Sequence, residues 1–198
     1  MNFVKALSLF RKEAGAASVE IVLLAPMLFL AGCQLVDLFL GFRANGLNYR
    51  AAYAVADSVS RIGQHEQLDR AQLEDLHDLF QFIVKSDGDT AIRVTVVKLE
   101  SDPVTGQPEL NIKFSEAEPQ SFGRVTSIDE IRNRIPIMGL SDEVIITQTH
   151  SEWEPVYIDI GTRNYNELIV SRPRFTQTVT FDDGGGGGVG TAPGGPGT

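Results

Sequence analysis

The chain has 198 residues, about one domain with an anchor. Its 17 basic and 26 acidic residues give a formal net charge of −9, which argues against a nucleic-acid-binding protein with its usual basic face. A single cysteine excludes an internal disulfide and every CxxC-type site, and three histidines leave little room for a histidine-rich metal cage. We therefore expect no nucleic-acid partner, no metal and no cofactor.

Residues 16–42 are the most apolar part of the chain. Only Ser18, Glu20, Gln34 and Asp37 are clearly polar within it. A helix of this length is long enough to cross a bilayer. Three basic residues and one acid precede it, so the positive-inside rule keeps the N-terminus in the cytoplasm. In a bacterium, the rest of the chain then lies in the periplasm.

Three interpretations of this apolar segment compete. A removable secretory signal has an apolar stretch of about 7–15 residues, whereas the apolar character here continues through Leu38–Phe42. Residues 30–33, LAGC, resemble a lipobox with Cys33 as the lipid acceptor, but the residues after Cys33 are still membrane-like. The third interpretation is a retained helix with a removable basic leader. It alone accounts for Glu20, a carboxylate at the start of the apolar run.

The residues around Glu20 resemble the class III signal of type IV pilins and pseudopilins. A basic stretch is followed by Gly15, then AASVE, then the apolar run. The resemblance implies that a prepilin peptidase cuts between Gly15 and Ala16 and that the helix is kept. The new α-amino group of Ala16 would be cationic. In an assembly it would pair with Glu20 of a neighbouring subunit and set the axial register; alternatively, Glu20 lies near the lipid headgroups.

A more specific resemblance begins at residue 10. Residues 10–30, FRKEAGAASVEIVLLAPMLFL, look like the N-terminus of TadE-like proteins, whose pattern is a basic start and then G-A-A-A-V-E-F-A-L-V-A-P. Ile21 stands where Phe is common, and the resemblance continues loosely to about residue 62. It implies a minor pseudopilin of the tight-adherence (Flp) pilus system, of TadE or TadF type. The matching positions are Gly15, Ala16, Ala17, Val19, Glu20, Ala25 and Pro26.

The pattern after the apolar segment predicts that the same helix continues and ends near Gly63. Small residues dominate residues 43–62, which suits tight packing on a partner helix. Pro26 predicts a mild kink, because its ring removes one helical hydrogen bond. The side chains that recur with the helical period are Ala44, Leu47, Ala51, Val55, Ser58 and Ile62.

Asp69 to Lys85 predicts a second, amphipathic helix with Asp69 as its N-cap. His77 lies among carboxylates without a suitably spaced partner, so we expect a solvated side chain and not a metal ligand. Residues 86–89, SDGD, predict a turn and lack the ligand ladder of a calcium loop. The apolar stripe of this helix is Leu73, Leu76, Leu79, Phe80 and Ile83.

The remaining patterns predict an antiparallel sheet. Ser127-x-x-Glu130 predicts a capping box that opens a short helix ending at Pro136. Pro173 favours an edge strand or a break in the last strand. A loop at residues 102–108 joins the first two strands as a hairpin. The predicted strands are around residues 92–98, 110–114, 143–153 and 168–180.

These expectations divide the chain into four parts. Residues 1–15 form a basic leader, residues 16–62 a transmembrane and assembly helix, and residues 63–183 an α+β periplasmic head. Residues 184–198, in which nine of 15 residues are Gly, form a disordered tail. The expected partners are other pilin-like subunits, the prepilin peptidase and inner-membrane lipid.

No catalytic set emerges from the sequence. His150, Ser151 and Glu152 are consecutive on a predicted strand, so their side chains point to opposite faces. We expect no enzymatic activity and no small-molecule substrate. Trp153, Tyr157 and Tyr165 are expected to be core or interface aromatics. The chief alternative from another class is a membrane-anchored or Cys33-lipidated periplasmic binding or sensor protein.

Overall fold

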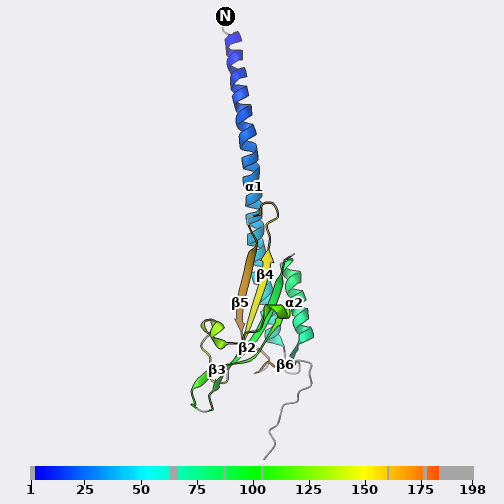
Figure 1. Ribbon diagram of the computed structural model, residues 1–198, viewed down its shortest axis with the longest axis vertical. Coiled ribbons are helices and arrows are strands. Elements are labelled where there is room, and N and C mark those ends of the chain that lie inside the picture. Colours follow the sequence, from blue (N-terminus) through cyan, green and yellow to red (C-terminus); the bar gives the residue numbers. More distant parts are fainter. Residues whose placement is uncertain are drawn as a thin grey trace, which may run out of the picture.

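A single long helix carries the rest of the molecule. The computed structural model describes residues 3–62, 67–86, 88–103, 105–159, 161–175 and 178–182, with side chains from Glu20 onward. Helix α1 (Phe3–Arg61) has 59 residues and continues through Pro26 as one element. Its C-terminal half lies in an α+β head and its N-terminal half projects from it (Figure 1). The predicted end near residue 62 is confirmed, whereas the tail at 184–198 lies outside the described residues.

The head contains a second helix, an antiparallel sheet and short 3-10 turns. The sheet has the strand order β3-β2-β4-β5, and β1 pairs with β6 in parallel. The predicted α+β class, with one long apolar helix and an antiparallel sheet, is confirmed. The elements after α1 are β1 (Leu68–Asp69), α2 (Arg70–Val84), β2 (Thr90–Ser101), β3 (Pro108–Glu118), η1 (Gln120–Phe122), η2 (Ile128–Glu130), η3 (Arg132–Arg134), β4 (Glu143–Trp153), β5 (Arg163–Ser171) and β6 (Phe181–Asp182).

Helix α2 begins at its predicted N-cap, Asp69, and ends at Val84, one residue before Lys85. The Asp69 carboxylate accepts a hydrogen bond from the backbone N–H of Gln72 at 2.7 Å, and the Gln72 side chain accepts from the Asp69 N–H at 3.4 Å. This is the reciprocal capping box. Lys85 closes the helix in the left-handed conformation, with φ of 52°. The predicted stripe is shifted, since Leu79 is exposed; the buried side chains are Leu73, Leu76, Phe80 and Val84.

The four-stranded sheet is covered on both faces. Helices α1 and α2 cover one face, while η2, η3 and the residues beside them cover the other. This two-sided burial follows from the period of two along each strand. The strand side chains that face the helices include Ile92, Val94, Val96 and Ile145. Those that face the 3-10 turns include Val97, Val144 and Ile146.

The small residues of α1 pack within the chain itself. The C-terminal half of α1 contacts α2 and also β4 and β5. The sequence predicted a partner helix for this face; the structure supplies α2 and adds the sheet. Small side chains let backbone elements approach closely and pack to interior density. The buried residues of this face are Asn48, Ala51, Ala52, Val55, Ala56, Val59 and Ser60.

Strand β5 differs from its prediction. It begins at Arg163 and not at Leu168, and it ends at Ser171 and not at Thr180. Its first residues, RNYNE, are polar because β5 is an edge strand with exposed side chains, so hydrophobic alternation did not mark them. The early end agrees with Pro173, which has no N–H to donate to a neighbouring strand.

One local prediction is confirmed and another needs correction. The capping box of Ser127 and Glu130 is present, and the short helix that it opens is the 3-10 turn η2, followed by η3, which ends before Pro136. His77 is half-buried and not solvated: its Nε2 lies 3.1 Å from both the carbonyl oxygen and the Oγ1 of Thr90. The packing of α2 beside the start of β2 brings these groups together.

Two phenylalanines of α2 offer a matched test of this packing. Phe80 has no solvent exposure, whereas Phe82 is 76% exposed. Phe80→Ala should lower the free energy of unfolding by about 3–5 kcal/mol, because it opens a cavity between α2 and the sheet. Phe82→Ala should change it by no more than about 0.5 kcal/mol. Denaturant unfolding of the detergent-solubilised full chain measures both, and equal losses would contradict the described core.

Candidate functional site: the projecting half of helix α1

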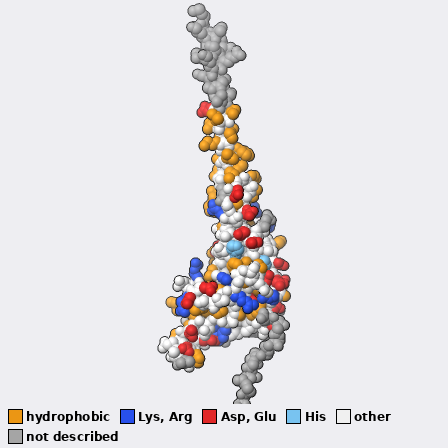
Figure 2. Space-filling view, viewed as in Figure 1, with side chains coloured by type: hydrophobic (Ala, Val, Ile, Leu, Met, Phe, Trp, Pro, Cys, Tyr) orange, Lys and Arg blue, Asp and Glu red, His pale blue; other side chains and the backbone are white. Residues whose placement is uncertain are grey.

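The projecting segment, residues 20–36 of α1, exposes almost all of its apolar side chains. Figure 2 shows them as a continuous orange column beyond the head. Among the described residues, one helix, Glu20–Arg61, is long and apolar enough to cross a membrane. The large apolar side chains of the projecting segment are exposed by 45–71%: Ile21, Val22, Leu23, Leu24, Met27, Leu28, Phe29, Leu30, Leu35 and Val36.

The predicted assembly residue, Glu20, lies at the start of the projecting segment. Its side chain is exposed and has no hydrogen-bond or ion-pair partner among the described residues. Gly15 and Ala16 lie on the same helix, with Ala16 about one turn before Glu20. The structure thus places the three predicted site residues on one continuous helix, and their predicted roles in cleavage and pairing remain predictions.

Asp37 ends the projecting segment, and its carboxylate is buried. Oδ1 accepts hydrogen bonds from the backbone N–H groups of Val156 at 2.9 Å and Tyr157 at 3.2 Å. Oδ2 accepts from the N–H groups of Tyr157 at 3.2 Å and Ile158 at 2.9 Å. Three successive amides from the loop between β4 and β5 therefore compensate the carboxylate. Sequence reasoning noted Asp37 as polar but gave it no role.

Gly41 lies one turn further along α1 and lets the sheet approach closely. A Cβ at this position would lie 3.2 Å from the ring of Trp153. The Tyr165 hydroxyl donates a hydrogen bond to the Gly41 carbonyl oxygen at 2.9 Å. Burial raises the pKa of Tyr165, so the phenol keeps the proton that it donates at neutral pH. A cavity of about 200 Å³ opens beside these groups and is also lined by Arg163.

Asn48 completes this line of contacts on α1. The Ser151 hydroxyl donates to the Asn48 side-chain oxygen at 3.1 Å, and both residues are buried. Asp37, Gly41 and Asn48 lie on one face of the helix. We use the name junction for these three residues together with their partners on β4, β5 and the loop between these strands. The junction fixes the projecting segment to the head by polar contacts.

The remaining sequence candidates lie apart from any common site. His150 Nδ1 lies 2.6 Å from the side-chain oxygen of Asn166, while Ser151 points to Asn48 on the other face, as strand alternation predicts. Cys33 is a free, half-buried thiol on the projecting segment. Within the described ranges, no group of three His, Cys, Asp or Glu side chains could hold a metal ion.

Comparisons with protein-family models, with curated proteins and with solved structures found no match to this chain. The role of the projecting segment is therefore inferred from its own chemistry and from the sequence pattern around Glu20.

The junction predicts a local effect of one substitution. Asp37→Asn should raise the hydrogen-exchange rates of the amides of residues 156–158 by roughly tenfold or more, because the new NH₂ group faces backbone donors and only one acceptor oxygen remains. Hydrogen exchange read by mass spectrometry on the detergent-solubilised full chain measures this.

The matched control is Asp57→Asn, on the same helix. Asp57 pairs with Arg61 at 2.7 Å and with Arg174 at 3.1 Å at the surface of the head. Its substitution should leave exchange at residues 156–158 unchanged. If Asp37→Asn also leaves these amides protected, Asp37 does not hold the loop.

Proposed function

We propose that the chain is a minor pseudopilin of a tight-adherence (Flp) pilus system, anchored in the bacterial inner membrane. Its N-terminus is cytoplasmic and its head periplasmic. It packs with other pilin-like subunits through α1, and its mechanism is interaction and not chemistry. The observation that carries the proposal is the projecting segment, an exposed apolar helix that starts at Glu20, a carboxylate with no partner among the described residues.

The apolar surface of the projecting segment supports a membrane or helix-bundle environment. Exposed apolar patches of this extent are rare on soluble monomers and mark membrane or protein contacts. At 1.5 Å per residue, residues 17–36 span about 30 Å, the thickness of the hydrocarbon core of a bilayer. The basic residues before this segment favour a cytoplasmic N-terminus.

Glu20 supports assembly with related subunits and not a plain anchor. A carboxylate inside a membrane segment costs about 2.5–3.5 kcal/mol on insertion scales, so such residues usually have a partner. None exists for Glu20 within the described part of the chain. Cleavage after Gly15 would create that partner, the Ala16 ammonium, on each neighbouring subunit. The pair would neutralise both charges and select one axial offset between helices.

The state of the N-terminus tests the processing step. Intact mass and N-terminal sequencing of the membrane-extracted protein should give a chain that starts at Ala16. Its first residue should carry a free α-amino group. A lipidated Cys33 as the first residue would overturn the proposal in favour of a lipoprotein, and an unprocessed Met1 would favour a plain anchor.

The charge of Glu20 is tested by Glu20→Gln. Removal of one partner from a buried ion pair costs about 3–5 kcal/mol, so incorporation into assembled pili should fall by about a hundredfold or more. Membrane insertion should persist, because Gln is less costly than Glu in lipid.

Glu109→Gln is the matched control, since it removes the same charge from an exposed position in β3. Cells that carry it should assemble pili normally. Normal assembly with Glu20→Gln would show that Glu20 has no pairing role. Pilus yield by shearing and the amount of the chain in membrane fractions are measured together.

A further inference from the structure

The first part of the loop between β4 and β5, residues 154–159, lies against α1 where the projecting segment leaves the head (Figure 1). Its backbone amides face α1, whereas its apolar side chains are exposed. The N–H groups of residues 156–158 point to the Asp37 carboxylate. The side chains of Val156 and Tyr157 are 67% and 60% exposed. The loop therefore satisfies its polar groups on the helix and leaves an apolar side-chain surface uncovered.

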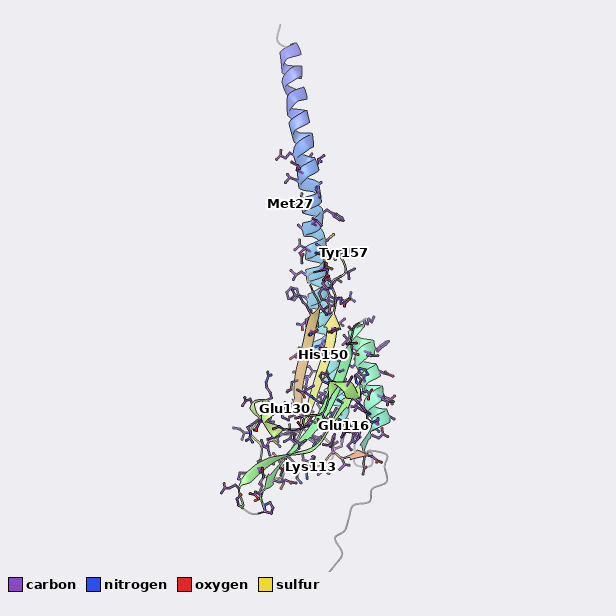
Figure 3. All side chains as sticks on the ribbon, in the orientation of Figure 1. Met27, Lys113, Glu116, Glu130, His150 and Tyr157 are labelled. Atoms are coloured by element: carbon purple, nitrogen blue, oxygen red, sulfur yellow. The ribbon has the colours of Figure 1, made fainter. Side chains whose placement is uncertain are left out.

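This surface lies beside Asp37 of α1, just beyond the end of the projecting segment. Asp37 is about 15 Å from Met27 along the helix axis at 1.5 Å per residue, and half of a hydrocarbon core is also about 15 Å. Figure 3 shows Met27 on the projecting helix and Tyr157 beside the helix nearer the head. If residues 17–36 span the bilayer, the loop lies at its periplasmic surface.

We propose that residues 155–158 are a second membrane contact of this protein, in which Val156 and Tyr157 insert into the lipid interface beside the transmembrane helix. The proposal rests on the proposed membrane anchoring of α1, and it assigns a membrane-binding role to the head. The occupant of this surface is the bilayer itself, because Asp37, which holds the loop, directly follows the exposed apolar residues of the projecting segment.

Asp37 makes this contact energetically feasible. Irregular backbone is excluded from a lipid environment unless its polar groups are satisfied within the protein. The Asp37 carboxylate accepts hydrogen bonds from the amides of residues 156–158, which are also the residues that carry the apolar side chains of the loop. The amides in turn compensate the only charge on α1 at this level, so neither partner depends on water for its hydrogen bonds.

The residues on either side of the loop centre fit a shallow position. Glu154 and Asp159 flank the apolar residues and are exposed, and carboxylates do not enter the hydrocarbon core without cost. They therefore limit insertion to the interface. Tyr157 is of the residue type that is enriched at this depth, with an apolar ring and a polar hydroxyl.

The cavity at the junction is also lined by residue types that are typical of a membrane interface. Trp153 and Tyr165 line it together with Arg163, which has no ion-pair partner among the described residues. Aromatic rings and arginine side chains are typical of the membrane–water boundary, where a guanidinium meets lipid phosphates. A helix and a loop that both contact lipid would resist rotation of the head about the single span.

Depth-dependent fluorescence quenching tests the contact. Trp153 is the only tryptophan, so Trp153→Phe gives a background in which one new tryptophan reports on one position. Tyr157→Trp, Leu28→Trp and Thr105→Trp are each made in the full chain and placed in lipid nanodiscs. The lipids carry bromine either near the glycerol end or near the methyl end of their acyl chains.

Three different results are expected if the loop contacts lipid. Leu28→Trp, in the projecting segment, should be quenched most by the deep bromines, and Tyr157→Trp most by the shallow ones. Thr105→Trp, in the hairpin at the far end of β2 and β3, should be quenched by neither.

The pattern of failure separates the two proposals. Quenching at residue 28 without quenching at residue 157 would overturn the loop contact and leave the membrane anchor in place. No quenching at either position would overturn both. Quenching at residue 105 equal to that at residue 157 would show that lipid contact is not particular to the loop, and this also overturns the proposal.

A second measurement keeps Trp153 in place. Cys33→Ala removes the only cysteine, and a spin label on Tyr157→Cys then reports on the loop. Its accessibility to oxygen should exceed its accessibility to a water-soluble nickel complex, as expected for an interfacial depth. The reverse order, with an unperturbed Trp153 emission spectrum, would overturn the lipid contact in a correctly folded head.

Discussion

Helix α1 is uninterrupted, although its C-terminal half packs in the core of the head and its N-terminal half projects from it. The rest of the structure depends on this continuity. Residues such as Ala51, Val55 and Val59 form part of the core of the head, while the large apolar side chains from Ile21 to Val36 are exposed. A helix can satisfy its own backbone in water, protein or lipid alike, which no single strand can do. Only the side chains must therefore differ between the projecting half and the packed half of α1. The sequence accordingly changes from large apolar residues to small ones along the helix.

The two carboxylates of the apolar segment, Glu20 and Asp37, differ in how the free-energy cost of removing their charge from water is compensated. Asp37 is compensated within the chain by three backbone N–H groups, and it has no ion-pair partner among the described residues. Glu20 has no such groups in the described part of the chain. An acid with a complete set of internal partners has no free capacity for another molecule, whereas an uncompensated one gains most from an external cation. This difference supports a structural role for Asp37 and an assembly role for Glu20.

Much of the fold could be predicted, because periodicity and caps are local signals. Strand β4 has the bounds that alternation predicted, and the Asp69 cap follows from its position before an amphipathic run. The start of β5 could not be predicted, since RNYNE is stabilised by pairing with β4 and not by its own apolar pattern. The role of Asp37 was equally hidden, because its partners are backbone amides more than a hundred residues away. Glu20, by contrast, was marked by its neighbours in sequence alone.

If α1 spans the bilayer and pairs at Glu20 as proposed, the positions of the two carboxylates link register in the assembly to depth in the membrane. No charged residue lies between Glu20 and Asp37, and the helix between them is about 26 Å long, slightly less than the hydrocarbon thickness of a bilayer. In a bilayer spanned by this helix, each carboxylate would lie near one boundary of the hydrocarbon core. Because α1 is continuous, an axial shift imposed at Glu20 moves the loop at Asp37 by the same distance. Under the proposed function, the depth at which the loop contacts lipid would therefore fix the level of Glu20 before assembly, and leaving the bilayer would break the lipid contact as the Glu20 pair forms between subunits.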